Sequence, residues 1–286
     1  MRLGAKRRTR MKLQYLGTGA AEGMPAIFCD CATCQTARAR GGKNIRTRSQ
    51  AIVDGTLLID FPSDTYFHFI AYGVPLSKIH SCLITHSHMD HLYAKEALMR
   101  LAQFTHLDDV TPLTFYSDAA GCRKVDAENA PYVHEDRIRS KQIALYEPFE
   151  VEGFTVTALR AQHDPKSDPV VYLIEKDGRT LFYSNDTGGY PEESWSYLAS
   201  LSKPIDLVSF DCTFGAKDTD DHGHMTVSRC IAARERLREI GAVSDQTVYV
   251  LNHFSHNGEV MLHEELSALV EKDGFLVAYD GMSIDV

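Results

Sequence analysis

The sequence predicts an α/β fold with two sheets that are covered by helices on the outside. Three observations lead to this prediction. Strand-like and helix-like segments alternate along the chain, no Gly/Ser-rich or Pro-rich linker separates them, and a hairpin pattern occurs twice. Both hairpin patterns end in a carboxylate, which indicates a β-rich unit that is present in two copies.

The first predicted elements are a strand and a hairpin. Lys12 to Leu16 forms the strand, which runs into the turn Gly17-Thr18-Gly19. Gln50 to Phe61 forms the hairpin, with Asp54-Gly55 as a tight turn of the kind that two-residue connections favour. Its second arm ends in Asp60.

The second hairpin is predicted over residues 170–186, with Asp177-Gly178 at its turn and Asp186 at its end. Apolar residues at positions 94, 97, 98, 101 and 104 repeat with the period of a helix. Thr226 or Ser228 would cap a later helix, and Gly241 would end it. The predicted helices cover residues 93–104, 225–240 and 259–270, and further buried strands cover 205–210, 248–251 and 275–279.

Composition limits the classes of function. The apolar fraction is 44%, and no stretch approaches the roughly 18 apolar residues of a membrane span. The net charge of −9 argues against a general surface for polyanions. Residues 1–10 are basic and lack the apolar core of a secretory signal, so we expect a disordered or non-native extension before a single domain at 11–286. With seven cysteines, an odd number, we expect a cytoplasmic protein without disulfides.

The most informative motif is Thr85-His86-Ser87-His88-Met89-Asp90-His91, which follows an apolar stretch. His86 and His88 would share one side of extended chain, because alternate residues point the same way. After a turn, Asp90 and His91 could reach a second position nearby. Imidazoles and carboxylates suit zinc, iron or manganese, and two adjacent positions indicate a two-metal hydrolase. The alternative is a loop that is merely rich in histidine.

Three further ligand candidates follow predicted strands, one at a time. They are His163, Asp186 and His253. A lone histidine at the end of a strand is usually structural. Beside the motif at 86–91, however, these residues favour a metal site.

These motifs resemble those of the metallo-β-lactamase fold hydrolases, and the resemblance extends from residue 11 to nearly the end of the chain. The H-x-H-x-D-H run is the signature of that family, and the later His, Asp and His occur in the family's order. The resemblance implies an αββα four-layer sandwich in which two mixed sheets are flanked by helices. It gives Asp60 a structural role, which we interpret as ordinary buried capping. The implied ligands are His86, His88 and His163 for the first metal, Asp90, His91 and His253 for the second, and Asp186 as the bridge.

A second cluster has C-x-C-x-x-C spacing in the loop 29–34: Cys29, Cys31 and Cys34. Structural zinc takes four ligands, and His256 is a plausible fourth. A redox trio or inert thiols are the alternatives. The loop resembles that of a branch that contains the cyclic phosphodiesterase of the carbon–phosphorus lyase pathway. Pyrroloquinoline quinone synthesis proteins share it, so it does not fix the substrate. The remaining cysteines, at 82, 122, 212 and 230, are predicted core residues.

The resemblance also implies a proton donor. In that branch a Gly-His pair before a helix supplies a histidine that contacts phosphate and assists departure of the leaving group. His224 matches it, and His222 is the fallback. Arg46 and Arg48 are interpreted as solvated loop arginines, with anion binding as the alternative.

The predicted activity is hydrolysis of a small anionic phosphodiester, including cyclic ones. A metal-bridging hydroxide is the expected nucleophile, His224 the general acid, and Asp90 a catalytic metal ligand. The expected cofactors are two divalent ions (Zn, Mn or Fe) and one structural Zn. Neither a membrane nor a nucleic-acid polymer is an expected partner, and the sequence leaves open whether the chain forms a homodimer. Alternatives are a lactone or other acyl hydrolase, a diiron reductase, a catalytically silent metal-binding protein and a transfer-RNA nuclease.

Overall fold

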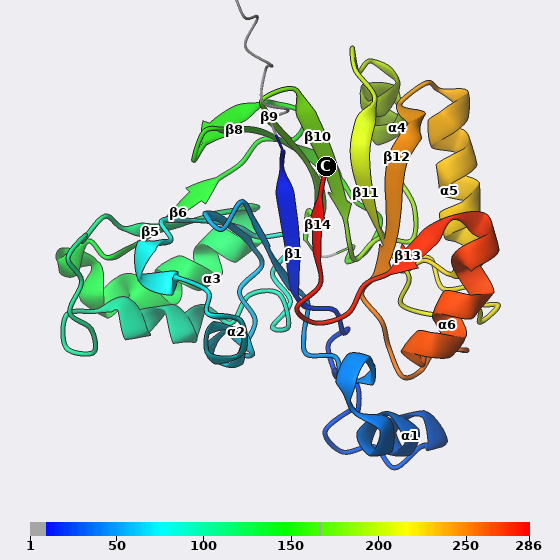
Figure 1. The fold of residues 1–286 in the computed structure, drawn as a ribbon. Helices are drawn as coiled ribbons and strands as arrows, with labels where there is room; N and C mark the ends of the chain where they lie inside the picture. Colours follow the sequence, from blue (N-terminus) through cyan, green and yellow to red (C-terminus); the bar gives the residue numbers. More distant parts are fainter. Residues whose placement is uncertain (1–9, 166) are drawn as a thin grey trace, which may run out of the picture.

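Two seven-stranded sheets face each other in the computed structural model, which describes residues 10–165 and 167–286 (Figure 1). The arrangement confirms the predicted α/β fold with two mixed sheets and outer helices. The basic residues Lys6, Arg7 and Arg8 lie outside the described residues, and Arg10 is exposed.

The first sheet has the order β14-β1-β2-β3-β4-β5-β6. Its first four strands pair antiparallel, and β3 to β6 pair parallel. The strands are β1 (Lys12–Gly17), β2 (Gln50–Val53), β3 (Leu57–Ile59), β4 (Ser81–Leu83), β5 (Leu113–Ser117), β6 (Ile138–Gln142) and β14 (Ser283–Asp285).

The second sheet has the order β13-β12-β11-β10-β9-β8-β7. When it is followed from β7, its strands pair in the same sequence as those of the first sheet followed from β14. Strands β7 to β10 are antiparallel, whereas β10 to β13 are parallel. The strands are β7 (Phe149–Val151), β8 (Phe154–Arg160), β9 (Val170–Lys176), β10 (Arg179–Ser184), β11 (Ile205–Asp211), β12 (Val243–Asn252) and β13 (Phe275–Val277). The two predicted hairpins are β2–β3 and β9–β10, at equivalent places in the two sheets.

Both faces of the central strands β2 to β4 are buried, which explains their continuous apolar runs. In β3, Leu57 and Ile59 belong to the larger core, which also contains the residues of the second sheet. Leu58, between them, points to a smaller core under the outer helices. This alternation is the period of two that a strand imposes.

Helices cover the outer faces of both sheets (Figure 1). On the first sheet lie α2 (Thr65–Tyr72) and α3 (Ala119–Asn129), and on the second lie α4 (Glu192–Ala199), α5 (Val227–Glu239) and α6 (His263–Val270). The N-cap of helix α5 is Thr226, one of the two predicted caps, and its side chain accepts a hydrogen bond from the Arg229 N–H. None of the helices in the described residues has the length and apolar character that a membrane crossing needs.

Two predicted helices differ from the structure. The segment predicted as a helix over 93–104 is a 3₁₀ helix, η3 (Ala94–Arg100). Steps of three residues, from 94 to 97 and from 98 to 101 to 104, fit its three residues per turn. The helix predicted over 259–270 begins only at His263, because Val260 has φ of +57° and Glu259 bridges to Gly215.

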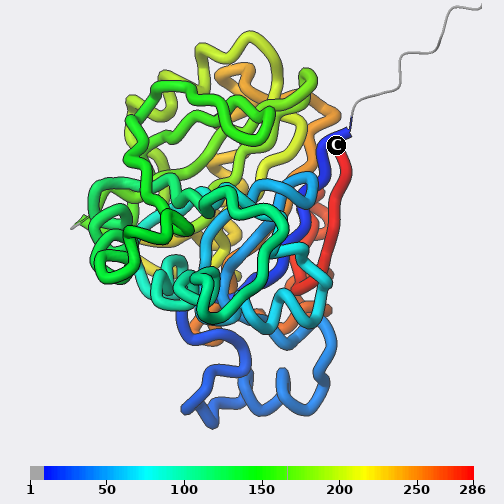
Figure 2. Tube along the Cα trace, turned by 90° about the vertical axis from the view of Figure 1, so that its left-hand side faces the viewer, coloured from blue at the N-terminus to red at the C-terminus, as the bar shows by residue number. Residues whose placement is uncertain are grey.

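Helix α1 (Ala32–Arg40) lies apart from the two sheets, in an excursion at the lower end of the molecule (Figure 2). This excursion contains the three clustered cysteines. Shorter 3₁₀ segments complete the fold: η1 (Gly42–Asn44), η2 (Leu76–Lys78), η4 (Ala130–Glu135) and η5 (Glu271–Asp273).

Candidate metal centre

The ends of four strands bring the predicted ligands together, and a fifth strand adds Asp211. The motif at 86–91 follows β4, and single residues follow or end the strands of the second sheet. The carboxyl ends of adjacent parallel strands meet at one edge, where α/β proteins commonly bind ligands. The residues from the second sheet are His163 after β8, Asp186 after β10, Asp211 at the end of β11 and His253 after β12.

The first group of ligand atoms belongs to His86, His88 and His163, whose candidate atoms lie within 4.8 Å of one another. The Nε2 atom of His86 is 2.9 Å from Nδ1 of His88. The same Nδ1 atom is 3.3 Å from Nε2 of His163. Burial lowers the pKa of His86 well below its usual value, so this imidazole is neutral, as a metal ligand must be.

The second group consists of Asp90, His91 and His253, which are all buried. The Nε2 atom of His91 lies 3.1 Å from Oδ2 of Asp90. The ring centroids of His91 and His253 are 5.4 Å apart. These three side chains come from two different sheets, so the fold itself assembles the group.

Asp186 lies between the two groups. Its Oδ2 atom is 2.8 Å from Nε2 of His91 and 3.0 Å from Nε2 of His253. Its Oδ1 atom is 3.8 Å from Nε2 of His163, on the side of the first group. One carboxylate oxygen therefore faces each group, which is the arrangement that a bridging ligand needs.

The hydrogen bonding of three buried atoms at the centre shows whether metal ions fit there. The Nε2 atoms of His91 and His253 and the Oδ2 atom of Asp186 are close together, yet none of them makes a well-directed hydrogen bond. Buried polar atoms are rarely left in this state. Nitrogen and carboxylate lone pairs that converge on a point are the donor set that zinc, iron or manganese prefers, so the residues fit divalent cations.

The charge balance of the centre agrees with that fit. Although burial opposes the charged form, Asp186 and Asp211 raise the pKa of His253 to about 10. His253 and His91 in turn hold the pKa of Asp186 well below its usual range, again against the effect of burial. The buried carboxylates thus attract positive charge, and protons and metal ions compete for the same atoms.

Asp60 does more than the buried capping that the sequence indicated. It is fully buried, has φ of +65° and accepts hydrogen bonds from the backbone N–H and the hydroxyl of Thr85. In addition, its Oδ2 atom is 2.7 Å from Nδ1 of His91. A carboxylate on one nitrogen of a histidine directs the other nitrogen toward a metal.

Asp211 was not found by sequence reasoning. Its Oδ2 atom is 3.0 Å from Nδ1 of His224 and 3.5 Å from Nδ1 of His253. It also accepts hydrogen bonds from the backbone N–H groups of Asp186 and Met225. A lone aspartate at the end of an apolar strand carries no spacing signal, so only its recurrence with Asp60 and Asp186 at strand ends could have indicated it.

His224 lies beside the metal groups, directly before α5. Its ring centroid is 4.8 Å from that of His163, and the ring stacks on His253. Burial favours the neutral ring, but Asp211 and then Asp186 outweigh it and raise the pKa of His224. The fallback residue His222 has an exposed side chain. The structure therefore brings His224, and not His222, to the centre by direct ring contact.

The cysteine cluster also comes together. Cys29, Cys31, Cys34 and His256 offer four ligand atoms within 4.8 Å of one another. Nδ1 of His256 is 3.6 Å from the Cys29 sulfur and 3.5 Å from the Cys31 sulfur. All three thiols are free, and the backbone N–H of Cys34 lowers the pKa of Cys31 to about 6. Four converging N and S donors fit a closed zinc site.

Arg46 is not a solvated loop residue, in contrast to the prediction. It is 1% exposed, donates to the hydroxyl of Thr18 and the carbonyl of Ala278, and lies over the ring of Phe254. The β1 end and the segment after β12 enclose it, which the local sequence does not reveal. Arg48 is partly exposed and pairs with Asp64. The four cysteines predicted for the core, at 82, 122, 212 and 230, are all buried.

Comparisons with known proteins agree with the fold described above. The model of the β-lactamase superfamily domain matches residues 65–254. Coenzyme PQQ synthesis protein B of Methylorubrum extorquens is 25% identical over 317 residues, which cover 96% of this chain and all of that protein. A diphosphatase of the PhnP family has a similar structure, with a TM-score of 0.75 and 22% identity over 97% of this chain and 98% of that one. Zinc-bound PqqB from Methylobacterium extorquens also gives a TM-score of 0.75, with 23% identity over 96% of this chain and all of that one.

Proposed function

This chain belongs to the β-lactamase superfamily, and from that premise we propose that it is a two-metal phosphodiesterase that acts on small phosphodiesters, including cyclic ones. The observation that carries the proposal is His224, a partly buried histidine with a raised pKa beside two facing groups of ligand atoms. Such a residue is suited to protonate a leaving oxygen.

The bound pair of divalent cations would polarise the phosphoryl group and ionise a water to serve as the nucleophile. His86, His88 and His163 would hold one ion, Asp90, His91 and His253 the other, and Asp186 both. His88 is nearly half exposed, so the centre is open to substrate at that side.

His224 completes the reaction as general acid. Asp211 accepts the Nδ1–H of His224, so the remaining ring nitrogen, Nε2, is the one available to give a proton. Thr213 contacts Nδ1 of both His224 and His253, which fixes the two rings relative to each other. The raised pKa favours the protonated form of this donor.

Two observations are consistent with a phosphate substrate. An alkoxide that leaves a phosphodiester needs a proton, and His224 is in position to supply one. A structure that resembles this chain over nearly its whole length is a diphosphatase, although that likeness by itself shows only the fold. The net charge of −9 favours a small substrate over a nucleic-acid polymer.

The test compares two neighbouring histidines. His224→Ala should reduce turnover of a ribose-cyclic nucleotide, whose leaving alkoxide needs a proton, by about 100- to 10,000-fold while the metal content stays the same. His222→Ala, which changes an exposed residue two positions away, should leave turnover unchanged. Unchanged turnover in His224→Ala, or rapid hydrolysis of a lactone by a protein that leaves phosphodiesters intact, would contradict the proposal.

A role like that of the PQQ synthesis relatives is a second candidate. The observation in its favour is the similarity, which spans the entire length of those proteins. A preparation that binds its metals fully yet cleaves neither bis(p-nitrophenyl) phosphate, nor ribose-cyclic nucleotides, nor a lactone would favour this candidate over the first.

A further inference from the structure

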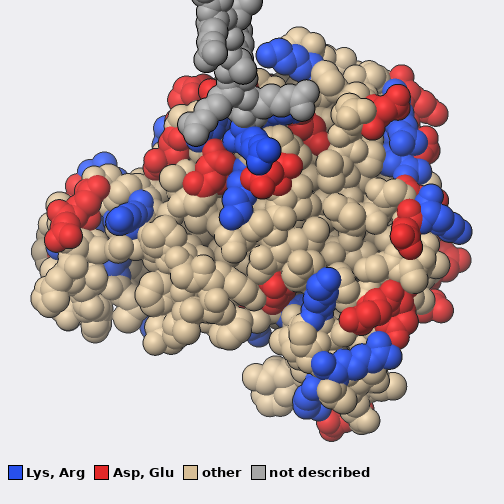
Figure 3. Space-filling view, viewed as in Figure 1, with Lys and Arg blue, Asp and Glu red and all other residues tan. Residues whose placement is uncertain are grey.

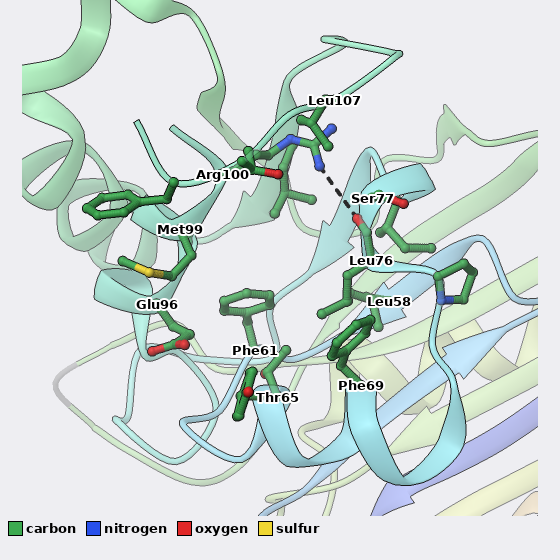
Figure 4. A pocket seen from close by; sticks show the side chains of 17 residues that line it. Leu58, Phe61, Thr65, Phe69, Leu76, Ser77, Glu96, Met99, Arg100 and Leu107 are labelled. Atoms are coloured by element: carbon green, nitrogen blue, oxygen red, sulfur yellow. Dashed lines mark hydrogen bonds between the residues drawn. The ribbon is translucent and has the colours of Figure 1, made fainter. Parts of the chain in front are cut away.

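A cavity of about 530 Å³ lies on the outer side of the first sheet, away from the metal centre. It is enclosed by α2, η3, the segment at 75–79 and the loop at 104–107. In Figure 4, Phe61, Phe69, Leu76 and Met99 surround its open centre. The volume falls within the range of small-molecule sites, and the lining is mainly apolar, as such sites usually are.

The mouth of the cavity is also apolar. Tyr66, Phe69, Met99 and Phe104 line it and are exposed by 63%, 44%, 48% and 56% of their surfaces. The surface around α2 shows few charged side chains in Figure 3. Contiguous exposed apolar surface of this kind commonly marks a binding site.

Arg100 supplies a cation to this apolar space. The residue lines the cavity and is only 8% exposed. Its terminal nitrogens donate to the carbonyls of Leu76 and Thr111 and contact Nδ1 of His80, but its buried Nε–H has no hydrogen-bond partner. Within the described part of the chain no carboxylate lies within ion-pair distance of it, and Asp109, which pairs with His80, acts on it only from farther away.

A second guanidinium adds to the positive charge at this end of the cavity, which Asp109 offsets only in part. Arg137 is close enough to lower the pKa of Arg100, after the larger effect of burial. Its own Nη1 is likewise buried without a hydrogen-bond partner. Buried cations are normally paired with an anion. In Figure 4 Glu96 lies on the side of Met99, whereas the Arg100 guanidinium lies toward Leu76 and Ser77.

We propose that this cavity binds a small amphipathic carboxylic acid, with its chain among the apolar side chains and its carboxylate on Arg100. The apolar lining fits an alkyl or aryl chain, and the unpartnered guanidinium donor fits the head group. The site is separate from the hydrolytic activity proposed above and does not depend on it.

Calorimetric titration of the metal-loaded protein with decanoate tests the proposal directly. We expect one decanoate per chain and weaker binding of decan-1-ol, which has the same chain but no charge. Arg100→Gln should weaken decanoate binding about ten- to hundredfold and change decanol binding little. Arg236→Gln, which alters an exposed arginine on α5, is the matched control and should bind like the parent.

Arg100 is buried, so its substitution also affects folding, and a second variant at an exposed position tests the site without that effect. Met99→Glu places a carboxylate at the exposed mouth and should weaken decanoate binding more than decanol binding. Equal binding of decanoate and decanol, or no binding at millimolar concentration, would overturn the proposal. A dimer detected by sedimentation analysis would also overturn the proposal if Tyr66→Glu separates it into monomers and if the protein does not bind decanoate. A second copy of the chain would then be the occupant of the cavity.

Discussion

The two sheets each contain a hairpin that ends in a buried aspartate, and these two aspartates have different tasks. Asp60 follows β3 and Asp186 follows the last residues of β10. Both have positive φ, +65° and +50°. They approach the same ring from opposite sides: Asp60 contacts Nδ1 of His91, and Asp186 contacts Nε2.

Their electrostatics differ accordingly. Burial raises the pKa of Asp60, and its single histidine partner does not outweigh that effect. For Asp186, His253 and His91 together overcome burial and lower the pKa. Equivalent places in a repeated topology can therefore hold a supporting carboxylate in one half and a ligand in the other, and the number of facing imidazoles makes the difference.

The largest expected effect follows from changing the ligand. Asp186→Asn removes the charge that faces both metal groups, so turnover should fall by about a thousandfold, equivalent to about 4 kcal/mol of transition-state stabilisation. Steady-state kinetics together with metal analysis by mass spectrometry measures both quantities. If the variant kept its turnover, the bridging role of Asp186 would be wrong.

The supporting aspartate should matter less. Asp60→Asn keeps the shape but weakens the hold on Nδ1 of His91, so metal affinity should fall about 10- to 100-fold. Added zinc or manganese should restore most of the turnover, whereas it should not rescue Asp186→Asn. If Asp60→Asn stayed inactive at saturating metal, the division into a supporting Asp60 and a metal-binding Asp186 would be wrong.

The cysteine cluster belongs to neither hairpin, so a change in it serves as a reference for the effects of the two aspartates. Cys31→Ser should remove one zinc ion per chain and lower turnover only several-fold, because its ligands are distinct from those of the centre. Metal content measured before and after gentle chelation checks this. Loss of all metals in this variant would mean that the two clusters do not bind independently.

Asp211, the third strand-end aspartate, should affect the pH profile. His224 must be protonated to act, so turnover is present below its raised pKa and is lost as the pH rises through that value. Asp211→Asn removes the main cause of the rise and should move the alkaline limb to lower pH. Thr213→Val, which keeps the charge, should move it less. An unmoved limb in Asp211→Asn would exclude His224 as the titrating group.

The last prediction concerns stability in acid rather than turnover, and it distinguishes the helices that follow the two aspartates. His68 on α2 is fully buried, and burial lowers its pKa from 6.5 to about 4. Its contribution is complete above pH 6.5 and is lost as the pH falls toward 4, about 3 kcal/mol in all. In urea unfolding, His68→Gln should lose less stability than the parent between pH 7.5 and 4.5. The buried polar residue of α4, Ser194, does not titrate.

Much of the fold and the four ligand candidates at 86–91 could be predicted because their signals are local, whereas His163, Asp186 and His253 became candidates only beside that motif and through the family resemblance. The hairpin turns at Asp54 and Asp177 and the dense motif at 86–91 are visible in short windows of sequence. Asp211 and the buried state of Arg46 were missed because tertiary neighbours from distant strands decide them. The apolar periodicity over residues 94–104 indicated a helix, but its three-residue steps belong to a 3₁₀ helix and not to the predicted α-helix.

One short stretch of backbone connects the two clusters. His253 belongs to the hydrolytic group and His256 to the thiol group, and Phe254 between them is clamped by backbone bonds to Thr18 and Ala20. Peroxide or another electrophile that modifies the exposed Cys31 would release His256 and loosen its neighbour. Oxidative stress would then slow turnover without any damage to the catalytic side chains themselves.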